Sequence, residues 1–243
     1  MILGFQGTTA LILGGSSAIG LALTELLQKE GLVAVPTHSS QDGLDRIQGR
    51  FPVLATSSPR LDLNDLDSLA SLDPFLESGV DYVIDLAQAD HETYLAAAGD
   101  SDMNDCFQAM ANRLHLLKAV TRSMLARRFG RLLYVSSTAA ALPAPGQGLY
   151  GASKRAAEGL YRSFGLELGS RGISTLSLRL GLIDAGRGER FLDRHDRRQN
   201  LAQKIVSLDQ AASTLLFLLS DQALALTCTT ITMDAGLTAQ KYL

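Results

Sequence analysis

A glycine-rich turn near the start of the chain lies between an apolar run and a helix pattern. Thr8–Leu13 is short, apolar and rich in β-forming residues, which predicts a buried strand. Leucines at helical spacing follow after the turn Gly14-Gly15-Ser16-Ser17-Ala18-Ile19-Gly20. Glycine lets the backbone turn tightly and approach a phosphate group, whose charge then faces the amino end of the helix. The unit predicts an α/β fold with a dinucleotide site, although an ordinary strand-to-helix turn can have the same residues.

A serine, a tyrosine and a lysine form the second signal. Ser137 follows the apolar run Leu132–Val135, so we expect it at the carboxyl end of a strand, where ligands bind in an open α/β sheet. Tyr150 and Lys154 are spaced to lie one turn apart on the same face of a helix. A free tyrosine titrates near pH ~10, and a nearby ammonium favours the phenolate. We therefore expect Ser137 to hold a substrate oxygen while Tyr150 exchanges a proton; Tyr-x-x-x-Lys alone recurs by chance on many helices.

The rest of the chain alternates strand patterns with helix patterns, without a linker or an internal repeat. Predicted strands cover residues 8–13, 32–36, 60–63, 79–87, 131–136, 173–180 and 229–233. Helix patterns lie around 21–27, 44–48, 103–128 and 208–220, and further helices begin near 64 and 150. Phe51–Leu54 is also apolar, but residues 60–63 are better placed for the third strand. This alternation predicts an α/β domain over residues 1–243: a Rossmann-type doubly wound parallel sheet of about seven strands, with helices on both faces.

Composition agrees with one folded domain. The chain has 243 residues, and its hydrophobic fraction of 46% is enough for a sizeable core. The net charge of -3 gives no reason to expect nucleic acid or a membrane surface as a partner. No apolar run of ~18 residues and no basic-then-apolar leader is present, which predicts a cytoplasmic protein. Cys106 and Cys228 are too few for a disulfide scaffold or a zinc site, and we expect no metal.

These motifs together resemble the single-domain short-chain dehydrogenase/reductase family, from about residue 8 to 236. The family motif TGxxxGxG falls on Leu13–Gly20, with leucine in place of the threonine and Ala18 in place of the middle glycine. The similarity is greatest to 3-oxoacyl-[acyl-carrier-protein] reductases, through the segments Lys118-Ala119-Val120, Arg127-Arg128-Phe129-Gly130-Arg131 and Met233-Asp234-Ala235-Gly236. The family's catalytic serine, tyrosine and lysine fall on Ser137, Tyr150 and Lys154.

The resemblance implies an NAD(P)-dependent oxidoreductase. We expect NADPH-dependent reduction of a ketone, namely a 3-oxoacyl thioester on coenzyme A or on acyl carrier protein. One alternative is oxidation of a small or cyclic secondary alcohol by the same residues. Another is a weakly active structural subunit that pairs with a competent homologue. The family also implies a homotetramer joined through the long helices and the carboxyl-terminal region, with a dimer or a mixed assembly left open.

Cofactor contacts are implied by position in the family. After the second strand, Thr37-His38-Ser39-Ser40 lacks the acid that binds the ribose hydroxyls of NAD, so His38 and Ser39 favour NADP(H). NAD(H) remains the alternative because no arginine is there to bind the extra phosphate. Asp62 resembles the family's aspartate beside the adenine, and a helix-capping role is the alternative. The other implied contacts are Gly14, Ser16, Ser17, Ile19, Gly20, Ala87, Tyr150, Lys154, Gly181 and Ile183.

Three segments depart from the family pattern. The usual Asn-Asn-Ala-Gly after the fourth strand is Asp85-Leu86-Ala87-Gln88, which alters one wall of the cofactor site. Ala109 stands where the family has its fourth catalytic residue, an asparagine that holds a water. Asn112 lies one turn later and is a candidate substitute, with a packing role as the alternative. Pro-Gly-x-Ile-x-Thr becomes Leu-Gly-Leu-Ile-Asp-Ala at 180–185, so the phosphate-reaching threonine is missing.

Arginines provide candidate contacts to an anionic substrate or to a carrier protein. Residues 184–200 match the family's substrate lid in position and contain Arg187 and Arg190. A second basic group contains Arg127, Arg128 and Arg171, at places where the carrier-protein reductases use arginines to dock the carrier. For any single one of these arginines, a solvated ion pair or a helix-end charge is the competing interpretation.

Overall fold

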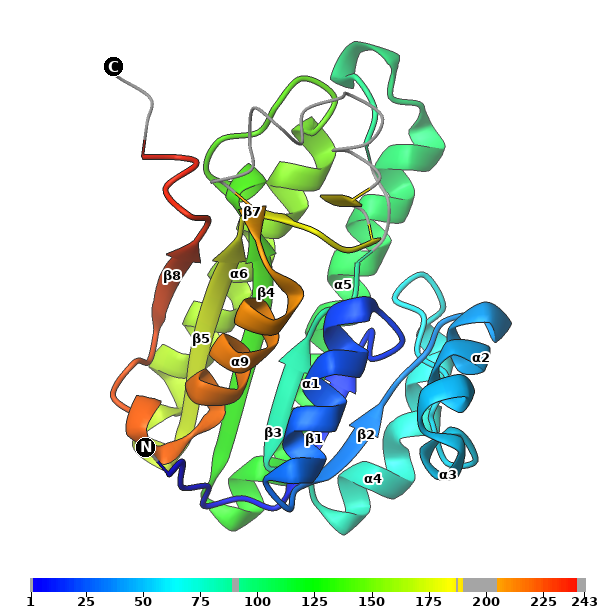
Figure 1. Ribbon diagram of the computed structural model, residues 1–243. Helices are drawn as coiled ribbons and strands as arrows, with labels where there is room; N and C mark the ends of the chain where they lie inside the picture. The colour runs from blue at the N-terminus through cyan, green and yellow to red at the C-terminus, as the bar shows by residue number, and fades with distance from the viewer. Residues whose placement is uncertain (1, 89–91, 187, 190–204, 240–243) are drawn as a thin grey trace.

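A six-stranded parallel sheet forms the centre of the molecule (Figure 1). The computed structural model describes residues 2–88, 92–186, 188–189 and 205–239. Neighbouring strands pair in the order β2-β1-β3-β4-β5-β8, and every pair is parallel. A short parallel pair of β6 (Leu182–Ile183) and β7 (Ile205–Val206) lies outside this sheet. The strands of the main sheet are β1 (Thr9–Leu13), β2 (Val33–Pro36), β3 (Tyr82–Asp85), β4 (Gly130–Ser137), β5 (Ile173–Leu180) and β8 (Thr229–Met233).

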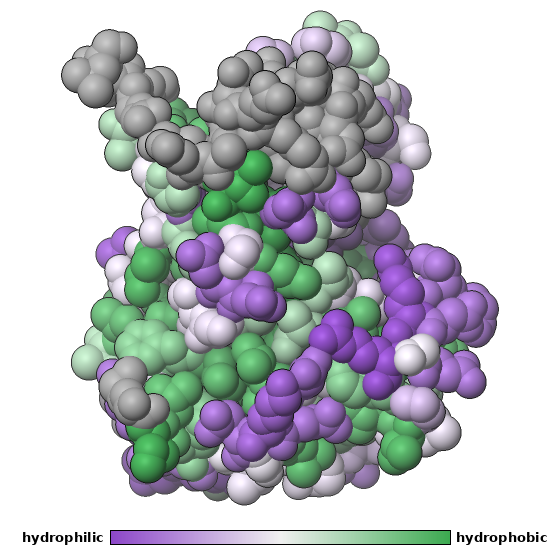
Figure 2. Space-filling view, in the orientation of Figure 1, coloured by the Kyte–Doolittle hydropathy of each residue, from purple (hydrophilic) through white to green (hydrophobic). Residues whose placement is uncertain are grey.

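Helices cover both faces of the sheet, as a doubly wound fold requires (Figure 1). On one face, α1 (Ala18–Lys29) packs against α9 (Leu208–Leu219). The other face carries α5 (Asp100–Arg127) and α6 (Gly148–Leu168). In the view of Figure 2, hydrophilic residues gather over α2 (Gln41–Arg50), whereas hydrophobic residues are more frequent over α9.

Alternation along the strands explains why two cores form. In β1, Ala10 and Ile12 pack into the cluster that contains residues of α1 and α9, whereas Leu11 and Leu13 pack into the cluster of α5 and α6. Successive strand side chains point to opposite faces, so a strand that is apolar at every position is buried on both sides. The apolar run that predicted a buried strand is therefore covered by helices on each face.

The predicted strand at 60–63 is the main error in the fold prediction. Buried and less buried side chains do alternate along this segment, because Leu61 and Leu63 are buried. However, its backbone pairs with the segment after β2 at one residue only, through a single parallel bridge between Arg60 and His38. The sheet therefore has six strands rather than about seven, since one bridge at the edge satisfies few backbone groups. Most of the apolar run at 51–54 lies in a short helix, which begins at Pro52. Between β2 and β3 the remaining elements are α3 (Pro52–Ala55), a 3-10 helix η1 (Leu66–Leu72) and α4 (Asp73–Ser78).

The strand order places a crevice at the carboxyl ends of β1 and β3. The chain leaves β1 outward to β2 and then returns to the other side of β1 as β3, so these two strands flank the point where the winding direction reverses. Ligands bind at such switch points in open α/β sheets.

Short 3-10 helices complete the described elements, namely η2 (Leu95–Ala97), η3 (Thr138–Ala140), η4 (Gly169–Arg171) and η6 (Asp221–Ala223). Among the described residues, every helix is too short or too polar to span a lipid bilayer.

Candidate active site

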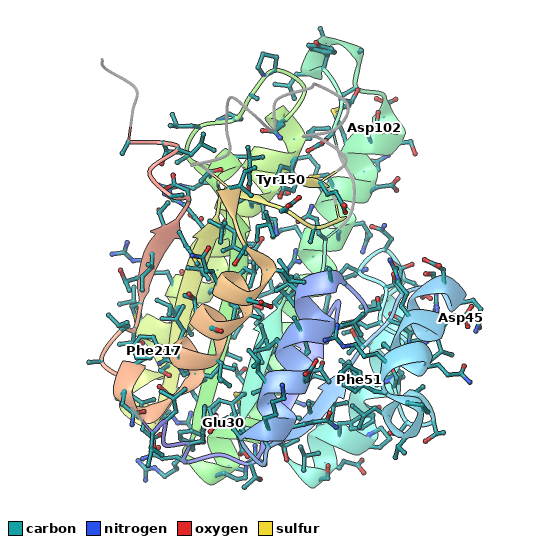
Figure 3. All side chains as sticks on the ribbon, in the orientation of Figure 1. Glu30, Asp45, Phe51, Asp102, Tyr150 and Phe217 are labelled. Atoms are coloured by element: carbon teal, nitrogen blue, oxygen red, sulfur yellow. The ribbon has the colours of Figure 1, made fainter. Side chains whose placement is uncertain are left out.

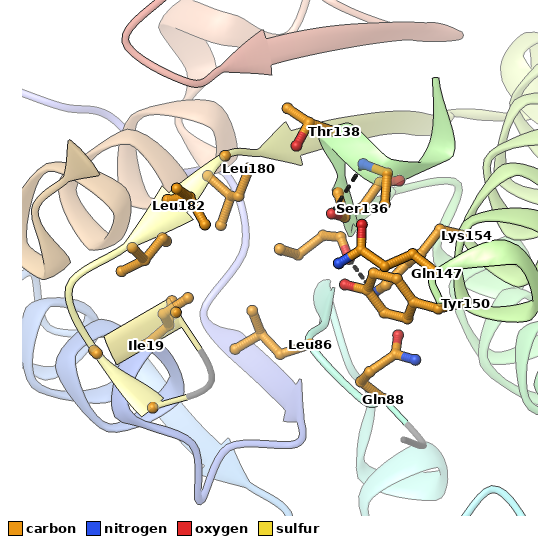
Figure 4. A pocket seen from close by; sticks show the side chains of 18 of the residues that line it. Ile19, Leu86, Gln88, Ser136, Thr138, Gln147, Tyr150, Lys154, Leu180 and Leu182 are labelled. Carbon is orange, nitrogen blue, oxygen red and sulfur yellow. Dashed lines mark hydrogen bonds between the residues drawn. The ribbon is translucent and has the colours of Figure 1, made fainter. Parts of the chain in front are cut away.

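A cavity of about 650 Å³ lies at the carboxyl-terminal edge of the sheet (Figure 4). It extends from the glycine-rich turn after β1 to the amino-terminal turns of α6. In Figure 3, Tyr150 lies at this edge and Glu30, just after α1, lies at the opposite edge. Its polar lining residues include Ser17, Gln88, Glu92, Ser136, Ser137, Thr138, Gln147, Tyr150, Lys154 and Thr238.

Ser137 is the last residue of β4, as its position after an apolar run predicted. Its hydroxyl accepts a hydrogen bond from the backbone N–H of Ala139 at 3.2 Å, at the start of η3. This bond leaves the hydroxyl proton free to be donated elsewhere, because only a lone pair is used. Ser137 lines the cavity and can therefore donate to an oxygen bound there.

Tyr150 and Lys154 lie one turn apart on α6 and both line the cavity. The Lys154 ammonium lies 5.9 Å from the centroid of the Tyr150 ring, and its side chain is buried (Figure 4). It donates a 2.8 Å hydrogen bond to the backbone carbonyl of Val135, two residues before Ser137. This bond ties the active-site helix to the strand that carries the serine, so the three side chains share one rigid frame.

A buried carboxylate supports this frame from behind. Glu158, one turn after Lys154, accepts a 2.7 Å hydrogen bond from the Ser136 hydroxyl and two bonds of 2.7 Å from the Arg179 guanidinium on β5. Burial alone would raise the pKa of Glu158, but the bonds from Arg179 and Ser136 outweigh it and hold the pKa below the usual value. The carboxylate therefore stays charged at neutral pH and fixes the strand end next to Ser137.

The glycine-rich turn packs closely against neighbouring backbone, which leaves little room for a side chain at Gly14. Gly14 has a φ of +68°, and a Cβ atom there would lie 3.0 Å from the backbone carbon of Leu86. Its N–H donates to the Thr37 hydroxyl at 3.0 Å, and the Thr37 carbonyl accepts from the N–H of Ser16 at 3.1 Å. Thr37 thus fixes the turn from the end of β2. Sequence reasoning missed this role, because the pairing crosses 23 residues without a local pattern.

The turn fits the phosphate groups of a dinucleotide. Ser17 caps α1 by accepting from the N–H of Gly20, and the cavity begins where this helix begins. A Cβ at Gly20 would lie 2.6 Å from the carbonyl oxygen of Gly15, so the helix start can pack closely only with glycine. Helix amino termini attract anions through their free N–H groups and dipole. Ser17 and Ile19 line the cavity at this end, whereas Gly14, Ser16 and Gly20 shape the turn behind it.

Gly181 and Ile183 lie on the wall opposite α6. Both line the cavity, and Ile183 belongs to β6. Gly181 donates its N–H to the Met233 carbonyl at 3.0 Å, and a Cβ there would meet Asp234 at 2.7 Å. The structure thus brings the segment after β5 to the same cavity as Tyr150 and Lys154.

The residues expected beside the adenosine lie outside the cavity lining. His38 is buried, and its Nδ1 lies 3.1 Å from the Ser58 hydroxyl; burial and then the charge of Arg60 lower its pKa. Ser39 is exposed. Asp62 accepts from the N–H of Asn64 at 3.0 Å, a local turn before the helix η1, whose N-cap is Asp65; Asp62 is therefore not the helix cap given as its alternative role.

Arg60 is a charged neighbour of His38 that the local sequence did not reveal. The backbone bridge between them places a guanidinium beside the end of β2, 22 residues away along the chain. The Arg60 side chain bonds to Asp65 at 2.7 Å and lies 3.8 Å from Asp62. An arginine at this corner supplies the kind of donor that an extra phosphate needs.

Asn112 does not reach the cavity. It is buried and donates from its amide to the Leu63 carbonyl at 2.8 Å, while its amide oxygen accepts from Gln108 at 2.9 Å. The packing role given as the alternative is the one its contacts describe. Ala109, on the same helix α5, is buried in the core. Ala87 lies in the loop after β3 and bonds to Asp85 and to Arg113.

The second basic group lies far from the cavity. Arg127 and Arg128 end α5, and Arg171 precedes β5, all at the amino-terminal edge of the sheet. Arg127 pairs with Asp81 and donates to the Val80 carbonyl. Within one chain these arginines do not contact a substrate in the cavity, because helix ends and strand starts place them at the opposite edge. Arg187, Arg190 and most of the expected lid at 184–200 lie outside the described residues.

The fold and the cavity define a single-domain α/β protein of the dinucleotide-binding type, and comparison with known proteins identifies its family. The family model described as enoyl-(acyl carrier protein) reductase matches residues 14–238. The chain is 30% identical to the 3-oxoacyl-[acyl-carrier-protein] reductase FabG of Salmonella typhimurium, over 96% of this chain and 98% of the relative. It is 29% identical to FabG of Escherichia coli K12 over the same shares. The chain belongs to the short-chain dehydrogenase/reductase family.

Solved structures give the same fold. A short chain dehydrogenase/reductase family protein superposes with a TM-score of 0.83 at 27% identity, over 98% of this chain and 100% of the other. L-Sorbose reductase from Gluconobacter frateurii, solved with NADPH and L-sorbose, has a TM-score of 0.86 at 20% identity over the whole of both chains. Among the described residues, no three His, Cys, Asp or Glu side chains gather as a metal site would require.

Proposed function

We propose that this protein reduces the ketone of a 3-oxoacyl thioester with NADPH. The observation that carries the proposal is the placement of Ser137, Tyr150 and Lys154 on one cavity that begins at the glycine-rich turn. The names of the FabG relatives, which cover nearly the whole chain, support the substrate class.

The proposed chemistry divides between the cofactor and three side chains. The nicotinamide cofactor supplies the hydride when bound. Ser137 donates a hydrogen bond to the ketone oxygen, and Tyr150 donates the proton that the oxygen takes up as the carbonyl carbon is reduced. Lys154 stabilises the negative charge left on the phenol oxygen, and holding these donors in place stabilises the developing alkoxide.

We propose a cofactor site that runs from the glycine-rich turn to the segment after β5. Gly14, Ser16, Ser17, Ile19 and Gly20 would hold the pyrophosphate at the start of α1, and Gly181 with Ile183 would flank the nicotinamide. NADP(H) is favoured over NAD(H) because no acid follows β2 at positions 37–40 and Arg60 lies beside His38. Replacing Arg60 with glutamine should weaken NADPH binding more than NADH binding.

The cavity lining suits an aliphatic thioester. Leu142 and Ala144 line it on the loop that precedes α6, and Leu182 lines it from β6. Apolar walls with a few convergent polar groups are typical of small-molecule sites. The ketone would lie at Ser137 and Tyr150, with the thioester arm, on coenzyme A or on a carrier protein, leaving past Leu142.

The long helices offer a surface for a homo-oligomer. Phe107 on α5 is 71% exposed and Leu166 on α6 is 66% exposed, and Leu114 is exposed on α5 as well. Contiguous apolar patches in solvent mark association surfaces, and these side chains lie on the two long helices that the family's oligomers would share. We propose a dimer or tetramer of identical chains through these helices, which the molar mass in solution, measured by light scattering, would test.

The first experiment is turnover of acetoacetyl-CoA, followed by loss of the reduced-cofactor absorbance. NADPH should be oxidised faster than NADH, and Tyr150→Phe should lower kcat by about 10³-fold or more while the protein still binds NADPH. Tyr94→Phe, at an exposed tyrosine outside the cavity lining, is the matched control and should be fully active. Near-normal turnover by Tyr150→Phe would overturn the mechanism, and no turnover of any 3-oxoacyl thioester would overturn the substrate class.

A further inference from the structure

A buried ion pair lies directly behind the cofactor wall. Asp85 ends β3 and is fully buried, and Arg113 on α5 is 5% exposed. The Arg113 Nε atom donates to Asp85 at 2.7 Å, and the Tyr161 hydroxyl on α6 donates to the same carboxylate oxygen at 2.9 Å. Burial opposes the charged form of Arg113, but the Asp85 carboxylate outweighs it and raises the pKa of the guanidinium. The Arg113 guanidinium therefore stays charged in the interior, in direct contact with Asp85.

The pair holds the loop that forms one wall of the cavity. The Asp85 carboxylate accepts from the N–H of Ala87 at 3.0 Å, and Arg113 donates to the carbonyl of the same residue at 2.7 Å. Both backbone groups of Ala87 are thus bonded to the ion pair. Leu86 and Gln88, on either side of Ala87, line the cavity, and Leu86 also packs against Gly14. The position of this wall is set by two charged side chains rather than by the loop alone.

The same pair reaches the active-site lysine through one aromatic ring. Tyr134 is the neighbour of Asp85 in the ladder between β3 and β4. The Arg113 guanidinium lies 5.4 Å from the centroid of the Tyr134 ring, and the Lys154 ammonium lies 5.0 Å from that centroid. Tyr161 stacks on Tyr134 with centroids 4.9 Å apart. Cations over an aromatic ring are attracted to it, so a ring held by Arg113 and Tyr161 offers Lys154 a fixed surface.

We propose that Asp85 and Arg113 are positioning residues for the proposed reaction. They set the Leu86–Gln88 wall beside the nicotinamide cofactor, and through the ring of Tyr134 they help to place the ammonium of Lys154. This inference rests on the proposed function. It also gives a physical reason for the departure at 85–88, where aspartate replaces the family's first asparagine. Arg113 balances the added negative charge, and its planar guanidinium bonds to the carboxylate and to the loop carbonyl at the same time.

Arg113→Lys tests this role while it keeps a cation beside Asp85. A single ammonium lacks the fork that bonds Asp85 and the Ala87 carbonyl together, so the wall should loosen although the charge remains paired. We expect the Kd for NADPH, measured without substrate by the fluorescence of the bound reduced nicotinamide, to rise about tenfold, and kcat to fall by a similar factor. The KM for acetoacetyl-CoA should stay within about twofold of the wild type, because the thioester arm leaves on the other side of the cavity.

Two tyrosine-to-phenylalanine variants provide a gentler, matched comparison. Tyr161→Phe removes the hydroxyl that donates to Asp85 and keeps the ring on Tyr134. Tyr82→Phe removes a buried hydroxyl that accepts from the N–H of Gly7 at 2.8 Å, at the opposite edge of the sheet. Both should lower the Tm slightly, but only Tyr161→Phe should raise the Kd for NADPH, by about threefold.

The outcomes separate this inference from the proposed function. NADPH binding that is unchanged in both Arg113→Lys and Tyr161→Phe, in a wild type that binds NADPH, would show that the ion pair serves only the fold and would overturn the inference alone. A wild type that binds neither NADPH nor NADH would overturn the proposed function and the inference with it. Weaker binding in Arg113→Lys and Tyr161→Phe, with Tyr82→Phe unchanged, supports the positioning role even if acetoacetyl-CoA proves to be the wrong ketone.

Discussion

Two buried arginines at opposite edges of the sheet are held in different ways. Arg113, at the carboxyl-terminal edge, pairs with Asp85. Arg131, at the amino-terminal edge, is completely buried and donates to the carbonyls of Leu218 and Ala223 at 2.6 and 2.9 Å. Burial lowers the pKa of Arg131 to about 10, whereas the carboxylate raises that of Arg113. The first arginine ties a loop of the site, and the second ties the ends of α9 and η6.

The difference teaches that the two edges carry separate tasks. Groups at the carboxyl-terminal edge converge on a cavity, and their contacts link backbone loops to the three proposed catalytic side chains. Groups at the amino-terminal edge bond to helix ends, where carbonyls carry partial negative charge. Substitutions at the first edge should therefore change binding and turnover, and substitutions at the second should change stability.

The largest effect is expected at Lys154, the buried cation closest to the chemistry. Lys154→Met keeps most of the side-chain volume and removes the ammonium that faces Tyr150, so kcat should fall by about 10³-fold. Circular dichroism should show a folded protein. Lys118→Met, at an exposed lysine of α5, is the control and should have normal turnover. High activity in Lys154→Met would break the assignment of catalysis to this edge.

The opposite pattern is expected at Arg131. Arg131→Met leaves the buried carbonyls of Leu218 and Ala223 without their donor, so the free energy of unfolding should fall by about 3 kcal/mol. Urea denaturation measures this loss. The turnover of the protein that remains folded should equal that of the wild type. A changed Kd for NADPH would show that the two edges are coupled after all.

An intermediate effect is expected at Glu158, which supports the site but is bonded as part of the fold. Because its folded-state pKa lies below the ordinary value of 4.5, its stabilising contribution is present above that pH and is lost as the pH falls below it. Glu158→Gln should lower the free energy of unfolding by about 2 kcal/mol at neutral pH. The difference in the free energy of unfolding between the variant and the wild type should shrink at acidic pH. An equal gap at all pH values would contradict the charge-based explanation.

The smallest effect is expected from replacing a glycine in the glycine-rich turn, compared with replacing a glycine elsewhere. Gly14→Ala and Gly31→Ala both place alanine at positive φ, +68° and +80°, which costs about 1–2 kcal/mol each. The added methyl group meets the Leu86–Ala87 backbone at Gly14 and nothing within 4 Å at Gly31. Gly14→Ala should lose more stability than Gly31→Ala because of this backbone contact, and only Gly14→Ala should bind NADPH more weakly. Equal binding by the two variants would argue against the turn as the phosphate site.

Prediction from sequence worked where local pattern and structure coincide. The strand 173–180 and the strand 229–233 were predicted with the observed bounds: the first alternates apolar and polar residues and the second is rich in β-branched residues, and both patterns are local. The spacing of Tyr150 and Lys154 placed both on one helix face for the same reason. The run at 60–63 has the alternation of a strand, yet whether it pairs depends on an edge that the local pattern does not describe.

The residues that support the site could not be predicted, because their partners are distant in sequence. Asp85 and Arg113 are 28 residues apart, and Thr37 bonds to Gly14 across 23. Each of these residue types is common on a strand end or a helix, so none gives a signal alone. Asn112 is the opposite case, because the local sequence suggested a catalytic role that its contacts do not support. It is an asparagine one turn from the family position, but its amide donates to the Leu63 carbonyl.

The single bridge between His38 and Arg60 bears on how easily this enzyme could be re-engineered. The corner beyond β2 is joined to the sheet by that bridge, and the side chains of Ser39 and Arg60 project into solvent rather than into either core. Exchanging these residues for an acid or for additional basic groups therefore disturbs little packing. Under the proposed cofactor site, we predict that directed evolution between the two nicotinamide cofactors would proceed at this corner through a few surface substitutions, while the folded scaffold is retained.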